Sequence, residues 1–284
     1  PSQEEEQQDR ATMERTKAVY LAVMERHKND AELMYNAQRG LCALAARWVE
    51  VLQDQAVAKH MSRALSSSRR EALALVTELL ALLQTPPDEP CCDRSVAVAG
   101  AIVQQHLRQL LRVAVEPDPQ LRAATVLLLD AVARHGVVGP SVLVPPLVAA
   151  LGDPSLPAPR ETAARTLAHL RQKYPSSVSG SKVAEGVRQA FLLQRALWKG
   201  RSSPICWGTR TATVKPLFAP MYPPPVASTR AQRFGLITSL LGPFKFLEEA
   251  PAAAAADEEA LQFLVFVGEV VAFLPFAFVA DVVE

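Results

Sequence analysis

The residues with the clearest chemical potential form a basic segment between positions 182 and 215. This segment contains seven cations and one acid, Glu185, which gives a local charge of +6. Lysine and arginine side chains bind phosphate groups without reading a base sequence. The alternative is that these side chains only solvate the surface. The candidate contacts for DNA or for a partner protein are Lys182, Arg188, Arg195, Lys199, Arg201 and Arg210.

Histidine and cysteine residues, the usual catalysts and metal ligands, show no such grouping. The five histidines are scattered over separate predicted helices, where a lone histidine is usually a surface or core residue. Cys91 and Cys92 are adjacent, which is a poor geometry for a disulfide or a shared zinc site. The sequence also contains no GxxxxGK[ST], GxSxG or HExxH motif. We therefore expect a protein that is not an enzyme and that has no metal or cofactor site.

The amino-terminal residues bear on the compartment of the protein. They read PSQEEEQQDR, which is polar and acidic where a secretory signal is basic and then apolar. We therefore expect an intracellular protein whose four cysteines are reduced thiols. The sequence lacks an initiator Met and ends in an apolar run, so we also expect a fragment of a longer chain.

The elements that must position these residues are predicted to be helices. Of the 284 residues 49% are hydrophobic, with few glycines (12) and many prolines (22) that lie between the apolar runs. Prolines in such places end helices rather than break them. The net charge of +1 gives no argument that the chain as a whole binds nucleic acid, although residues 245–284 carry a local charge of −7.

Two consecutive stretches repeat one helical hairpin. Residues 106–136 and 143–175 each contain an apolar helix, an acidic residue followed by proline, and a second helix with an arginine near its start. The two arginines, Arg122 and Arg160, lie 38 residues apart. A period of this length with two helices per unit is typical of HEAT repeats, which bury their apolar faces by stacking on neighbours. We predict an all-α fold, a HEAT-like α-solenoid of stacked helical hairpins.

The hairpins belong to the second of four predicted regions. Residues 1–92 form an amino-terminal helical segment, with a polar lead-in over residues 3–8 and breaks at Asn29, Asp30 and Gly40. Residues 93–198 hold the hairpins and one further helix from Lys182 to Trp198. Residues 199–228 form a Pro-rich loop, either an insertion hanging off the scaffold or a disordered segment. Residues 229–284 are the carboxy-terminal helices.

An apolar run from Leu261 to Ala280 raises the alternative of a tail-anchored membrane protein. Glu269 lies in its middle, Pro275 interrupts it, and no lysine or arginine flanks it. A charged residue at the centre of a bilayer is costly. The run is therefore better explained as a buried terminal hairpin broken at Pro275.

Several segments resemble the carboxy-terminal region of the Nipped-B/adherin family, the large subunit of the cohesin loader. The most specific is GVVGPSVLVPPLVAALGDPSLPAPRETAARTLAHLRQKYP, from Gly136 to Pro175. Three further pieces follow the family's order: HLRQLLRVAVEPDPQLRAATVLLLDAVA, STRAQRFGLITSLLGPF with Arg230 and Arg233, and FLVFVGEVVAFLPF. The likeness runs from about Ser95 to Phe276. The turn between Asp153 and Arg160, the Pro-rich insertion and the alanine tract at 252–256 depart from the family pattern, which puts surface contacts in doubt.

The resemblance implies a non-catalytic scaffold that acts in the nucleus on chromatin in sister chromatid cohesion and the cell cycle. Its implied partners are cohesin's kleisin and SMC subunits and DNA, and the SMC heads perform the ATP hydrolysis that accompanies cohesin loading. The loader's own partner subunit would bind outside this fragment. The alternative among helical-repeat proteins is a generic HEAT adaptor that binds neither cohesin nor DNA.

Overall fold

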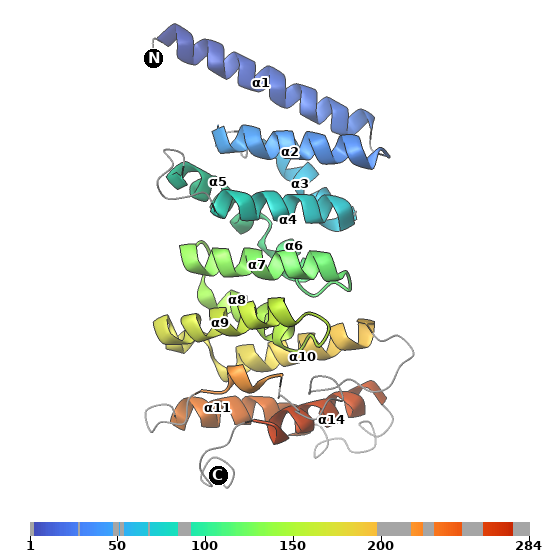
Figure 1. Ribbon diagram of the computed structural model, residues 1–284, viewed down its shortest axis with the longest axis vertical. Helices are drawn as coiled ribbons and strands as arrows, with labels where there is room; N and C mark the ends of the chain where they lie inside the picture. Colours follow the sequence, from blue (N-terminus) through green and yellow to red (C-terminus); the bar gives the residue numbers. More distant parts are fainter. Residues whose placement is uncertain are drawn as a thin grey trace. The chain divides into compact units, whose positions relative to one another are not determined.

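Every regular element that the structure describes is helical, which confirms the predicted all-α class. The structure is a computed structural model, shown in Figure 1. It describes residues 3–27, 29–47, 51, 54–67, 69–84, 92–197, 217–223, 230–245 and 258–274. The chain divides into two compact units. Unit 1 comprises residues 1–113 and 120–138, and unit 2 comprises residues 114–119 and 139–284.

Unit 1 is built from helices that pack on others close to them in sequence. Helix α2 packs on α1 and α4, and α4 packs in turn on α3 and α5. Leu75, Val76 and Leu79 of α4 are fully buried against these helices. The helices are α1 (Gln3–Arg26), α2 (Ala31–Arg47), α3 (Gln55–Ser67), α4 (Arg69–Leu83), α5 (Cys92–Gln105), α6 (Leu107–Val113) and α7 (Pro119–His135).

The amino-terminal part differs from its prediction at two points. Helix α1 begins at Gln3, so the expected polar lead-in is part of the helix. The predicted break at Asn29 and Asp30 is confirmed, and Asp30 Oδ1 accepts hydrogen bonds from the backbone N–H groups of the first turn of α2. The predicted break at Gly40 is wrong, because α2 continues through it. A Cβ at residue 40 would lie 2.3 Å from the Tyr20 ring, so this glycine lets α1 and α2 approach closely.

The helices of both predicted hairpins are present, and those of the second hairpin pack on each other. Helix α6 is followed by α7, and α8 (Pro140–Leu151) is followed by α9 (Pro157–Lys173). The second helices begin at Pro119 and Pro157, 38 positions apart, as the repeat requires. Proline suits the first turn of a helix because the missing N–H has no partner there. The repeat is not exact in burial, since Arg122 is buried whereas the equivalent Arg160 is partly exposed.

Unit 2 is organised around α8, in which every residue from Leu143 to Leu151 is buried. Helix α9 and helix α10 pack on α8, and α11 and α14 lie side by side beyond α10. The elements that complete this unit are η2 (Pro175–Ser177), α10 (Gly180–Leu197), η3 (Ala219–Met221), α11 (Arg230–Leu241), η5 (Gly242–Phe244) and α14 (Glu258–Ala272). The predicted helices at 182–198 and 229–241 are thus confirmed to within two residues.

Two glycines allow α10 and α8 to approach closely. A Cβ at Gly186 would lie 2.5 Å from Val148 Cβ and 2.7 Å from the Pro145 carbonyl oxygen. A Cβ at Gly152 would lie 2.6 Å from Ala190 Cβ. The buried Gln194 side chain then donates a 2.7 Å hydrogen bond to the Gly152 carbonyl, which ties α10 to the end of α8.

Part of the predicted Pro-rich loop is packed into unit 2 instead of hanging off the scaffold. In residues 217–223, Leu217, Phe218, Met221 and Tyr222 are all buried. The Arg171 guanidinium of α9 donates hydrogen bonds to three successive carbonyls here, those of Pro220, Met221 and Tyr222. Buried apolar side chains and the hydrogen bonds from Arg171 to the backbone therefore anchor this stretch. Residues 199–216 and 224–228 of the predicted loop lie outside the described residues.

The carboxy-terminal apolar run forms most of α14. Four of its side chains, Leu264, Phe266, Val267 and Val270, are buried in unit 2, where α14 packs on α10 and α11. None of the helices in the described part of the chain is long and apolar enough to cross a membrane. The predicted break at Pro275 lies outside the described residues.

We predict that Gly186→Ala destabilises the protein by about 1–3 kcal/mol, the usual cost of overpacking a core. The added methyl group would meet the backbone of α8, which cannot move without displacing the buried α8 side chains. Urea unfolding followed by circular dichroism measures the change. Gly268→Ala in α14 is the matched control, because its Cβ would lie 3.9 Å from Phe244 Cζ, an ordinary van der Waals contact. This variant should gain up to about 1 kcal/mol of helix propensity. Equal stability of the two variants would contradict the close approach.

Candidate functional site

The basic residues of the sequence analysis lie on α10, a helix with one buried face. Val183, Val187, Ala190 and Phe191 are buried, and the neighbouring surface carries Lys182, Arg188 and Arg195. Arg188 is exposed, whereas Lys182 and Arg195 are partly buried. The other three candidates, Lys199, Arg201 and Arg210, lie outside the described residues. The structure therefore places half of the predicted site.

Two of these three cations are paired with carboxylates of the same unit. Lys182 Nζ lies 2.8 Å from Glu185 Oε2, one turn along α10. Arg195 Nη1 lies 2.6 Å from Glu259 Oε2 on α14, and its guanidinium also lies 5.6 Å from the centre of the Phe191 ring. Arg195 thus links α10 to α14. A phosphate at either residue would have to compete with a carboxylate that is already in place.

Arg188 differs from the other two because it has no carboxylate partner in the described part of the chain. Its guanidinium carbon lies 5.7 Å from the centre of the Phe263 ring, a cation–π geometry between α10 and α14. The ring holds the guanidinium at the surface and leaves its N–H groups available to an anionic ligand.

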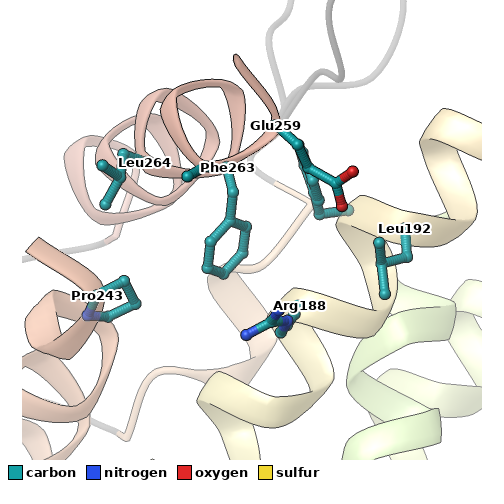
Figure 2. A pocket seen from close by; sticks show the side chains of 8 residues that line it. Arg188, Leu192, Pro243, Glu259, Phe263 and Leu264 are labelled. Atoms are coloured by element: carbon teal, nitrogen blue, oxygen red, sulfur yellow. The ribbon is translucent and has the colours of Figure 1, made fainter. Parts of the chain in front are cut away.

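Arg188 and Phe263 line a pocket between α10, η5 and α14, which we call the α10–α14 pocket. Its volume is about 370 Å³. Figure 2 shows the Phe263 ring pointing from α14 toward Arg188, with Pro243 on one side and Leu192 and Glu259 on the other. The pocket is lined by Arg188, Phe191, Leu192, Pro243, Glu259, Ala260, Phe263 and Leu264. A mostly apolar lining with a few charged groups at the edge is the usual composition of a binding pocket.

A cluster of phenylalanine rings holds the walls of this pocket. The Phe191 ring lies 5.2 Å from that of Phe263 and 5.6 Å from that of Phe266, centre to centre. The Phe266 ring meets that of Phe218 edge-on at 5.9 Å. These are favourable aromatic geometries, and they fix α14 against α10. The sequence analysis missed the pocket, because Phe191 and Phe263 are 72 positions apart and no local pattern pairs them.

The arginine pair that carried part of the family resemblance divides between the surface and the core. Arg230 is exposed at the start of α11, whereas Arg233 is only 2% exposed. Arg233 therefore belongs to the packed interior of unit 2.

The histidines occupy different environments. His27 and His169 are exposed, and His135 Nε2 lies 2.8 Å from the Leu83 carbonyl oxygen. His106, between α5 and α6, is buried, and its Nδ1 lies 3.3 Å from Ser62 Oγ. Its Nε2 is buried without a hydrogen-bond partner in the described residues. Burial therefore lowers the pKa of His106 below its usual value of 6.5.

Metal ligation has no candidate group in the residues that the structure describes. Among them, no three His, Cys, Asp or Glu side chains are grouped so that they could hold a metal ion. Of the four cysteines, Cys91 and Cys206 lie outside the described residues, and the side chains of Cys42 and Cys92 are outside them too.

The chain matches a known protein family. Residues 99–284 match the family of Nipped-B carboxy-terminal regions, described as the sister chromatid cohesion C-terminus. This match begins within α5 and covers both predicted hairpins, and it includes α10, α14 and the pocket between them. No curated protein matches the chain.

We predict that His106 makes the protein less stable at mildly acidic pH. Because the pKa of His106 is lowered in the folded state, the unfolded chain binds the proton more readily, so this contribution is complete above about pH 6.5 and decreases as the pH falls below it. Urea unfolding between about pH 7 and pH 5, the range in which histidine titrates, measures the change. His106→Gln should lose less stability over this range than the original chain. His27→Gln alters an exposed histidine of the same unit and should lose as much stability over this range as the original chain. The same loss in His106→Gln would contradict the interpretation.

Proposed function

Because the chain belongs to the Nipped-B carboxy-terminal family of sister chromatid cohesion, we propose that it is a non-catalytic scaffold that binds cohesin and chromatin. The family gives the chain a role in sister chromatid cohesion. Within that role, we propose that it promotes the loading of cohesin onto DNA in the nucleus. The family match over residues 99–284 is the observation on which this proposal depends.

The architecture of the chain supports a scaffold. Helical hairpins of the HEAT type bury one face against their neighbours and leave the other for partners. In unit 2 the innermost helix, α8, is wholly apolar from Leu143 to Leu151, while α10 presents Arg188 and Leu192 to the surface. Side chains of this kind are suited to contacts with other macromolecules. The ATP hydrolysis of loading would then belong to the SMC heads of cohesin.

Chromatin contact through the basic residues of α10 stays a prediction. Lys182 and Arg195 already have carboxylate partners, in Glu185 and Glu259. Exposed ion pairs are weak, so a DNA phosphate could replace the carboxylate at either cation. Breaking each ion pair lowers the net free energy gained on DNA binding. We therefore propose that the chain binds cohesin directly and that it binds DNA only when cohesin is present.

A binding experiment with purified components tests the proposal. The chain is immobilised and incubated with a kleisin subunit and with SMC heads, and we expect both to be retained. Leu147→Asp is the control, because it places a charge at a fully buried position of α8 and should unfold unit 2. Retention by the original chain but not by this variant supports the proposal. A generic HEAT adaptor would retain neither subunit, and that result at low salt would contradict the proposal.

A further inference from the structure

We propose that the α10–α14 pocket binds a short acidic segment of a partner protein. In this arrangement one aromatic or large aliphatic side chain of the partner fills the pocket, and a neighbouring carboxylate binds Arg188. The proposal goes beyond a role in cohesin loading, because it concerns the chemistry of one surface of this chain, whichever protein supplies the segment.

The apolar half of the proposed ligand follows from the pocket walls. Phe191, Leu192, Pro243, Phe263 and Leu264 provide most of the lining, and Leu192 is 46% exposed although it is large and apolar. The volume of about 370 Å³ has room for one large side chain together with its adjoining backbone. A side chain bound there would remove Leu192 and the exposed part of Phe263 from water.

The acidic half of the ligand follows from Arg188. Its guanidinium stands at the edge of the pocket, stacked 5.7 Å from the Phe263 ring centre. In the described part of the chain it has no carboxylate partner, whereas the two other described cations of α10 have one each. A guanidinium binds a carboxylate with two parallel hydrogen bonds, which sets the position of the acid relative to the apolar side chain. The charge of Arg188 is thus complementary to an acidic group of the ligand.

A second charged residue of the pocket, Glu259, argues against nucleic acid as the ligand. Its carboxylate is held 2.6 Å from Arg195. A DNA backbone would bring repeated phosphates past this carboxylate and would place no apolar group in the pocket. A peptide can direct its carboxylate toward Arg188 and its apolar side chain toward the phenylalanine rings.

The pocket is also preorganised for such a ligand. Its walls belong to helices that the buried Phe191 and Phe266 rings hold together, 5.6 Å apart between centres. Walls that are already fixed lose little conformational entropy on binding, which favours recognition of a short segment.

A random peptide library displayed on phage, selected on the immobilised chain, tests this inference. We expect the enriched peptides to contain an aromatic residue, leucine or methionine close to Asp or Glu. The most enriched peptide is then synthesised with a fluorescent label, and its affinity is measured by fluorescence anisotropy. Arg188→Glu should weaken its binding about tenfold or more, as the loss of a central arginine contact commonly does. Replacing the apolar anchor of the peptide with alanine should have a similar effect.

Lys173→Glu is the matched control. Lys173 is an exposed cation of the same unit that lies over a ring, 5.3 Å from the centre of Tyr174, but it does not line the pocket. Its reversal should leave peptide affinity unchanged, and circular dichroism should show both variants folded, since both side chains are exposed. No enrichment of acidic peptides, or equal loss of affinity in the two variants, would overturn the inference. The inference would also be overturned if a labelled DNA duplex bound at Arg188 more tightly than any peptide did.

The same variants separate this inference from the proposed function. If Arg188→Glu abolishes peptide binding but the chain still retains cohesin subunits, the pocket serves another partner and both proposals stand. If the original chain binds acidic peptides but retains no cohesin subunit, only the proposed function fails.

Discussion

The close packing of α10 on the buried helix α8 is the constraint on which the described site of unit 2 depends. A helix as apolar as α8 has to be covered on several sides, and Gly152 and Gly186 let α10 cover it at short distance. Gln194 then satisfies the Gly152 carbonyl from α10, so that a backbone group buried at the end of α8 has a partner. Because this face of α10 packs in the core, Arg188, Leu192 and Arg195 lie on the remaining face, at the surface.

The position of α14 follows from that arrangement. Phe191 is buried on α10 yet its ring also contacts Phe263 and Phe266, so the same side chain belongs to the core of unit 2 and to the wall of the pocket. The ion pair between Arg195 and Glu259 adds a polar link at the surface. The aromatic contacts provide most of the stabilisation here, because an exposed ion pair contributes little.

The charge of α10 has a different meaning in the structure than in the sequence. A count of cations suggests a helix that binds phosphates, but the fold gives Lys182 and Arg195 carboxylate partners and leaves Arg188 beside an apolar pocket. Two of the three described cations of α10 are therefore neutralised by carboxylates, and the third stands beside apolar side chains. Such a surface suits the scaffold role that we propose for this member of the sister chromatid cohesion family.

The sequence by itself determined the all-α class, the 38-residue spacing of Arg122 and Arg160, and the family, because helix periodicity, helix ends and the order of segments can be read directly along the chain. It could not determine what depends on residues that are distant along the chain. Gly40 is a helix breaker by local rules, yet it lies inside α2, where the Tyr20 ring packs closely against it. Likewise, residues 217–223 belong to a loop by composition, yet Arg171 and four buried side chains hold them in unit 2. The pocket was decided only by tertiary structure, since packing alone brings Phe191 and Phe263, and Arg195 and Glu259, into contact.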